Sequence, residues 1–194
     1  MELDLRFTSR PLEELWCDAV VAFMFEGAVS NGSGIAGLDY KTSGFLASLV
    51  RKGFFTGTEG EILLVASQGM IRAGKILLKG LGRHGGYGPE VLSGSVREVA
   101  ASLERLAVNE FGIRIPATGG GDARYLTDIR TACGELVDFF VDRHRDEADF
   151  FLKIVVSLNR VLCADLESMV GRMKAHFGNR LNYSVAFDRT EFDR

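Results

Sequence analysis

The sequence is poor in cysteine and in long apolar runs. Its only cysteines are Cys17, Cys133 and Cys163, and no two of them form a C-x-x-C pair. We therefore predict neither a disulfide framework nor a zinc knuckle, and expect free thiols in a reducing compartment. No run approaches the length of a membrane span, and residues 1–10 alternate in polarity, so we expect no signal peptide or anchor. A cytoplasmic protein is the resulting expectation.

Positive charge and catalytic motifs are also lacking. The net charge of −3 and the pI near 5.7 argue against a general electrostatic grip on nucleic acid or on an anionic membrane. The histidines, His84, His144 and His176, are scattered and form no H-E-x-x-H motif. No G-x-S-x-G elbow or P-loop lysine occurs. We therefore predict no catalytic residue, metal site or cofactor.

The apolar pattern that is present predicts alternating strands and helices in one domain of residues 1–194. With 46% hydrophobic residues, a sizeable core is expected. Alternation at Leu3, Leu5 and Phe7 predicts a half-buried strand. Continuous apolar runs predict strands covered on both faces at 19–25, 62–66, 76–78 and 150–156.

Apolar residues at helical spacing predict four helices. The first lies near Phe45, the second is opened by Pro89, the third follows Asp122, and the fourth stops at Gly178. The third helix has the longest apolar stripe, formed by Tyr125, Leu126, Ile129, Cys133, Leu136, Val137 and Phe140. Because Cys133 lies on this stripe, we expect a core residue rather than a nucleophile.

One short connection sets the direction of two strands. Only SQGMIRAG separates the run ending at Ala66 from the run beginning near Lys75. A parallel crossover needs roughly a dozen residues or more, so this pair is predicted to be antiparallel. The predicted fold class is therefore α/β, a three-layer α/β/α sandwich with a mixed sheet. Ligand sites are expected where its strands end in glycine-rich loops.

Two glycine-rich loops can each be interpreted either as a ligand-binding site or as an ordinary structural loop. GLGRHG, residues 80–85, matches G-x-G-x-x-G, but no helix opens directly after it, so a turn ending a buried strand fits better than a dinucleotide site. EGAVSNGSGIAGLD, residues 26–39, offers backbone N–H groups to an anion, although surface loops share its composition. Its candidate residues are Gly27, Asn31, Gly32 and Gly34.

A third loop, PATGGGDARYL, residues 116–126, lies between a strand-like run and the third helix. It fits either a phosphate cradle or a flexible joint in which Asp122 caps the helix. A phosphate would share the helix end with that carboxylate, and Arg124 would partly offset the repulsion. The candidate binding residues are Thr118, Gly119, Gly120, Gly121 and Asp122.

Several segments together resemble a known family. AVVAFMFEG, then Leu38 and Asp39, then LVRKGFFTGTEGEILLVAS and KILLKGLGR look like the amino-terminal domain of the leucyl aminopeptidase (cytosol aminopeptidase) family, over residues 18–116. The resemblance implies a macro-domain-like α/β/α sandwich. It also implies that a second domain would hold two metal ions, and no N-T-D-A-E-G-R-L motif of that domain occurs here.

Two functions follow from this resemblance. The first is a non-catalytic module with a structural, regulatory or assembly role, acting as a homo-oligomer or with a partner protein, because the site that would activate water is missing. The second is a binder or hydrolase of ADP-ribose or a related nucleotide phosphate, since residues 118–121 resemble the diphosphate loop of macro domains. Phe25 and Glu26 stand where those domains carry asparagines.

Overall fold

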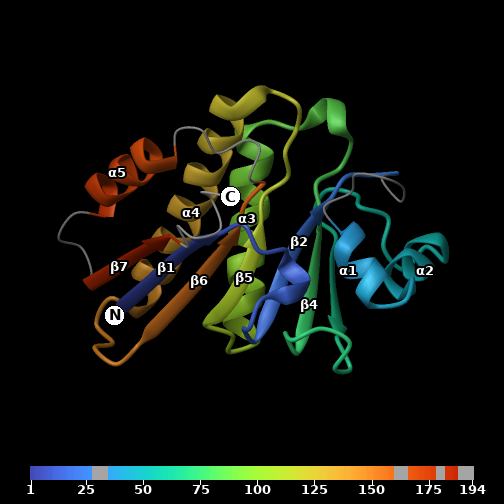
Figure 1. Cartoon of the computed structure of the whole chain (residues 1–194), viewed down its shortest axis with the longest axis horizontal. Helices are drawn as coiled ribbons and strands as arrows, with labels where there is room; N and C mark the ends of the chain where they lie inside the picture. Colours follow the sequence, from blue (N-terminus) through green and yellow to red (C-terminus); the bar gives the residue numbers. More distant parts are fainter. Residues whose placement is uncertain (28–34, 160–165, 178–181, 188–194) are drawn as a thin grey trace.

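A seven-stranded sheet forms the centre of the molecule (Figure 1). The computed structural model describes residues 1–27, 35–159, 166–177 and 182–187. The strand order is β3-β4-β2-β5-β6-β1-β7. The strands are β1 (Glu2–Thr8), β2 (Ala19–Met24), β3 (Ile62–Ala66), β4 (Lys75–Gly80), β5 (Glu110–Arg114), β6 (Phe151–Ser157) and β7 (Asn182–Phe187).

The sheet is mixed, as the length of one connection predicts. β3 and β4 pair antiparallel, with Ala66 opposite Lys75. Every other neighbouring pair is parallel. The short SQGMIRAG connection is therefore the one that reverses direction, and the predicted antiparallel pair is confirmed.

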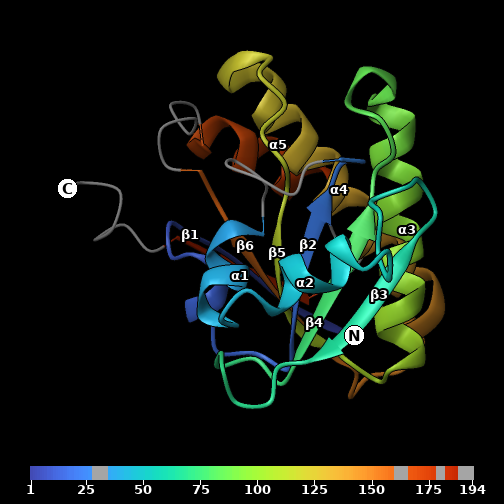
Figure 2. The same cartoon turned by 90° about the vertical axis from the view of Figure 1, so that its right-hand side faces the viewer.

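Helices pack on both faces of the sheet, which confirms the predicted α/β/α class (Figures 1 and 2). The helices α3, α4 and α5 lie on one face, and α1 and α2 lie on the other. Their bounds are α1 (Ala36–Lys41), α2 (Phe45–Arg51), α3 (Pro89–Arg105), α4 (Gly121–His144) and α5 (Leu166–Phe177), with short 3-10 turns η1 (Leu12–Glu14) and η2 (His84–Gly86).

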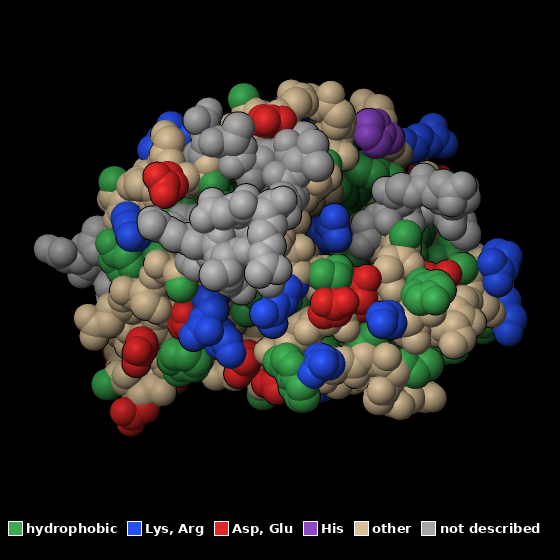
Figure 3. Space-filling model, viewed as in Figure 1, with side chains coloured by type: hydrophobic (Ala, Val, Ile, Leu, Met, Phe, Trp, Pro, Cys, Tyr) green, Lys and Arg blue, Asp and Glu red, His purple; other side chains and the backbone are tan. Residues whose placement is uncertain are grey.

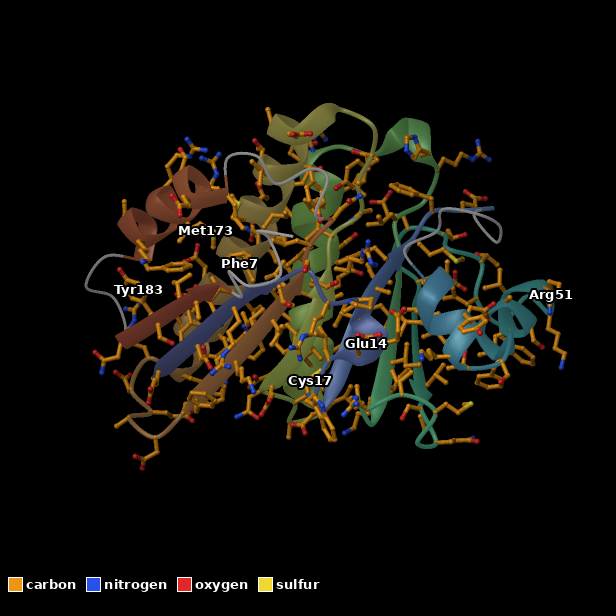
Figure 4. All side chains as sticks on the ribbon, in the orientation of Figure 1. Phe7, Glu14, Cys17, Arg51, Met173 and Tyr183 are labelled. Carbon is orange, nitrogen blue, oxygen red and sulfur yellow. The ribbon has the colours of Figure 1, made fainter. Side chains whose placement is uncertain are left out.

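Each face of the sheet has its own apolar core. The larger core joins β1 to α3, α4 and α5, and includes Phe7 and Met173, both labelled in Figure 4. The smaller core joins β2 and β4 to α1 and α2. All seven residues of the predicted stripe on α4 are buried. The predicted strand at the amino terminus is confirmed, with Leu3, Leu5 and Phe7 fully buried, but it is covered more than predicted, because Asp4 and Thr8 on its other face are buried as well.

Three further local features differ from the sequence expectation. α1 begins at Ala36, inside the stretch expected to be loop, because Ile35 and Leu38 pack into the smaller core. β3 is less covered than predicted, because it lies at the edge of the sheet, and Leu64 is 44% exposed. Lys79 follows the apolar run of β4 and is fully buried; its ammonium group reaches Glu98 on α3 at 2.6 Å.

The charged segment 142–149 ends α4 and is mostly exposed, as expected for a solvated turn. His144 is the exception, because its side chain is only 12% exposed. Its ring stacks on Phe150 with centroids 3.6 Å apart, and its Nε2 lies 3.0 Å from Glu104 of α3. Glu147 lies 3.0 Å from Nδ1, without the alignment of a hydrogen bond. His144 thus ties the end of α4 to α3.

This contact predicts a pH-dependent stability. Burial lowers the pKa of His144, but Glu104 and Glu147 outweigh it, and the pKa is raised. A group whose pKa rises on folding stabilises the native state below its unfolded pKa, about 6.5, and that stability is lost as pH rises through the folded pKa. The free energy of unfolding of the wild type should exceed that of His144→Gln most at about pH 5.5, and the gap should narrow at higher pH. Urea titrations measure the free energy of unfolding of both proteins. A difference between them that stays constant with pH would contradict this role of His144.

Candidate functional site

The candidate site lies at the carboxyl edge of β2 and β5, which pair in parallel with Ala22 opposite Arg114. The chain leaves β2 toward β3 and β4 on one side, whereas β5 leads to β6 on the other side. Open α/β sheets bind ligands where the strand order reverses in this way. Two of the predicted glycine-rich loops begin here, directly after β2 and after β5.

The β5–α4 loop has a backbone suited to an anion. Gly119 and Gly121 have positive φ angles of 82° and 75°, and Gly120 between them has φ −82° and ψ 13°. Alternation of left-handed and right-handed residues turns successive N–H groups toward one side, forming a concave anion-binding nest. All three glycines are exposed to solvent. We call residues 118–121 the glycine loop.

Glycine is required in this loop for two reasons. At Gly119 and Gly121 the left-handed backbone strains any L side chain, although a Cβ there would meet no other atom. At Gly120 an added Cβ would lie 2.9 Å from Cβ and Cγ of Arg124. The consecutive glycines thus reflect both conformation and close packing on the first turn of α4.

Asp122 does not cap the helix as predicted. α4 already begins at Gly121, so Gly120 occupies the cap position, with no side-chain hydrogen bond to the helix end. Asp122 lies within the first turn. Its carboxylate still complements the positive end of the helix dipole. No side chain hydrogen-bonds to the N–H groups at the start of α4, so no cap competes with a ligand there.

The loop after β2 is described only in part. Phe25, Glu26 and Gly27 follow the strand, and Gly27 has a φ of 76°. The other predicted residues of this loop, Asn31, Gly32 and Gly34, lie outside the described residues. The Glu26 N–H donates to Gly82 C=O at 2.8 Å, which ties this loop to the turn after β4.

GLGRHG is a turn ending a buried strand. Gly80 is the last residue of β4, where an added Cβ would lie 2.1 Å from the carbonyl oxygen of Thr58. The Gly82 N–H donates to Gly57 C=O at 2.8 Å. These glycines allow two chain segments to approach closely, which agrees with the turn reading and accounts for the motif without a dinucleotide.

An aromatic cluster lies beside the two loops. Phe25 contacts His84 with ring centroids 4.7 Å apart and Tyr87 with centroids 5.4 Å apart. His84 is exposed, as expected from sequence. The Arg124 guanidinium lies 5.8 Å from the centre of the Tyr87 ring. The cluster therefore joins the ends of β2 and β4 to the first turn of α4.

A buried carboxylate orders this cluster. Asp128 has a side chain only 3% exposed; it accepts from Arg124 Nε at 2.9 Å and from the Tyr87 hydroxyl at 3.2 Å. Burial and the charge of Asp128 raise the pKa of Tyr87 well above its ordinary value, while Arg124 opposes the shift. Sequence reasoning missed Tyr87 and Asp128. The four-residue spacing of Arg124 and Asp128 was the available signal.

The described residues show no other obvious reactive centre. Burial raises the pKa of Cys17 to about 11 and that of Cys133 to about 12, so neither thiol is ionised at neutral pH. Among the described residues no group of three or more His, Cys, Asp or Glu side chains could hold a metal ion. Within the same ranges no helix is long and apolar enough to cross a bilayer.

The fold is shared with macrodomains. The chain superimposes on a Trypanosoma brucei macrodomain in complex with ADP-ribose with a TM-score of 0.62 and 18% identity, covering 90% of this chain and 69% of that one. A tomato leucine aminopeptidase mutant gives a TM-score of 0.69 and 12% identity, over 89% of this chain and 35% of the other. The layers and strand order are thus of the macrodomain type.

The family is established by sequence. The profile described as "Cytosol aminopeptidase family, N-terminal domain" matches residues 20–137, and the chain belongs to this family. The probable cytosol aminopeptidase of Alkaliphilus oremlandii is 30% identical over 96 residues, which are 50% of this chain and 18% of that protein. The probable cytosol aminopeptidase of Cupriavidus metallidurans is 33% identical over 86 residues, which are 44% of this chain and 17% of that protein. The chain therefore spans under a fifth of these relatives' length.

The buried carboxylate gives a stability prediction. Asp128→Ala removes the buried acceptor shared by Arg124 and Tyr87 and should lower the free energy of unfolding by about 2 kcal/mol, because two partly buried donors lose their partner. Asp142→Ala on the same helix is the control: that side chain is 68% exposed, and the change should stay within about 0.5 kcal/mol. Equal effects in urea unfolding would show that Asp128 does not order the cluster.

Proposed function

We propose that this domain acts by binding rather than by peptide hydrolysis, and that its glycine loop binds the diphosphate of a ligand of the ADP-ribose class. The observation that carries the proposal is the nest at Gly119, Gly120 and Gly121, exposed at the start of a 24-residue helix. Backbone N–H groups and the positive end of the helix dipole together favour an anion there. The cytoplasm, where such nucleotides occur, is the proposed compartment.

The charges around the loop favour a diphosphate ester over a more highly charged anion. Arg124 provides positive charge in the first turn of α4, whereas Asp122 adds negative charge to the same turn. Glu26 lies at the end of the neighbouring strand β2, 3.5 Å from Arg83. Arg83 offsets the charge of Glu26, so Asp122 is the carboxylate that opposes each further phosphate charge, and a triphosphate should bind more weakly than ADP-ribose.

The aromatic cluster supplies the second part of the proposed site. The rings of Phe25, His84 and Tyr87 lie at the ends of β2 and β4, next to the strand pair that carries the glycine loop. Aromatic faces stack on nucleobases and sugars independently of sequence. Solved macrodomains of this fold, in complex with ADP-ribose and with ADP, support the choice of ligand class.

Calorimetric titration tests this function. We expect saturable binding of ADP-ribose by the wild type, and at least about tenfold weaker binding by Gly120→Val, because a side chain at 120 displaces Arg124 and distorts the nest. Gly134→Ala is the matched control in the same helix, since an added Cβ there meets no atom within 4 Å. Absence of binding by the wild type, or equal affinity of Gly120→Val, would contradict the proposal.

A second candidate function is assembly, with a structural or regulatory consequence. The observation that favours it is the exposure of large apolar side chains, with Trp16 at 68%, Tyr40 at 82% and Phe54 at 66%. Charged side chains of both signs are intermixed on the face in Figure 3, so no one-signed field opposes self-association there. Light scattering of the purified protein should show a defined oligomer; a monomer at every concentration would exclude this function.

A further inference from the structure

The outer edge of β3 carries backbone groups that point away from the sheet. No described strand lies beyond β3 (Figure 2). In the ladder with β4, the Gly80 N–H donates to Glu61 C=O and the Ser67 N–H donates to Gly74 C=O. Since successive residues of a strand direct these groups to opposite sides, the even-numbered residues face outward. The outward-facing residues are Ile62, Leu64 and Ala66.

In the part of the chain that the structure describes, this edge shows no charged residue, proline or pairing segment that would protect it from another strand. The strand reads ILLVA, with no charged residue and no proline. Natural edge strands are usually protected by lysine, proline, a bulge or a covering segment. Leu64, at the centre, is 44% exposed, and no other leucine is among the exposed large hydrophobic side chains of the described residues. The edge is therefore suited to pairing with another strand.

We propose that β3 pairs antiparallel with β3 of a second copy of this chain, about a two-fold axis that passes between the two Leu64 residues. The inference rests on the assembly role proposed above and assigns it to one surface. The two sheets then form one continuous sheet, and neither copy keeps a free β3 edge.

A second copy fits because the outward-facing backbone groups of β3 can form hydrogen bonds with the same groups of another β3. With the axis at Leu64, the two Leu64 residues exchange both backbone hydrogen bonds, and Ile62 exchanges its pair with Ala66 of the second copy. Every outward N–H and C=O of the strand is then satisfied. Shifting the register by two residues leaves one end of each strand without an outward-facing partner inside the other strand.

Charge does not oppose this register. At the ends of the paired strands, Glu61 stands opposite Ser67 of the second copy. No like charges meet across the strand pair. The Glu61 carboxylate is already held within its own chain, where it accepts from the Thr56 and Gly57 N–H groups at 2.8 and 2.9 Å.

A proline substitution can disrupt this interface without disrupting the fold of the single chain. Leu64→Pro removes an N–H that points away from β4, so the ladder within the chain loses no donor, whereas the ladder between copies loses its central one. By sedimentation equilibrium, the wild type should form a reversible dimer, and Leu64→Pro should dissociate at least about tenfold more readily. Circular dichroism and thermal melting check that the variant is folded.

Cross-linking tests the same geometry without removing a hydrogen bond. Directly opposite, hydrogen-bonded residues have Cα atoms about 5.5 Å apart, within reach of a disulfide. Leu64→Cys, in a background with Cys17→Ser and Cys163→Ser, should therefore give a covalent dimer on oxidation. Phe54→Cys is the control, because Phe54 is even more exposed, at 66% against 44% for Leu64, but lies outside the strand, and it should give little dimer.

The outcomes distinguish this inference from the function on which it rests. A wild-type dimer that persists in Leu64→Pro, without cross-linking of Leu64→Cys, would overturn the β3 interface and leave assembly through another surface. A wild type that is monomeric throughout would overturn both. A dimer weakened by Leu64→Pro and cross-linked through Leu64→Cys supports the inference.

Discussion

The pairing of β2 with β5 is the constraint on which the rest of the structure depends. These strands lie at the centre of the sheet, and β2 is buried along its whole length. Because they run parallel, their carboxyl ends and the loops that follow come to the same edge. The position of the glycine loop, the start of α4 and the aromatic cluster all follow from this ladder.

The sequence was sufficient for the fold class and for the position of the glycine loop between β5 and α4. The stripe from Tyr125 to Phe140 identified the longest helix, because burial on one face demands that period. The eight-residue connection before Lys75 identified the antiparallel pair, because a parallel crossover needs more chain. The glycine loop could be located because three glycines between a strand and a helix are rarely required by packing alone.

Side-chain partners between distant segments could not be predicted in the same way. Tyr87 meets Asp128 across 41 positions of sequence, and His144 meets Glu104 across 40. Such pairs depend on how α3 and α4 pack, which no local pattern specifies. Asp122 failed as a cap for a more local reason: left-handed Gly121 already belongs to the helix, so the cap moved to Gly120. The buried Lys79 likewise depends on Glu98 of a neighbouring helix.

The domain thus combines a family membership shown by sequence with a proposed binding edge formed by backbone rather than by reactive side chains. The most direct test of that edge observes the loop itself. In a nitrogen-15 NMR titration with ADP-ribose, the amide resonances of Gly119, Gly120 and Gly121 should shift together and saturate, because the proposed site places their N–H groups against the diphosphate. Unchanged glycine amides at a ligand concentration that saturates other resonances, or no shifts at all, would contradict the account.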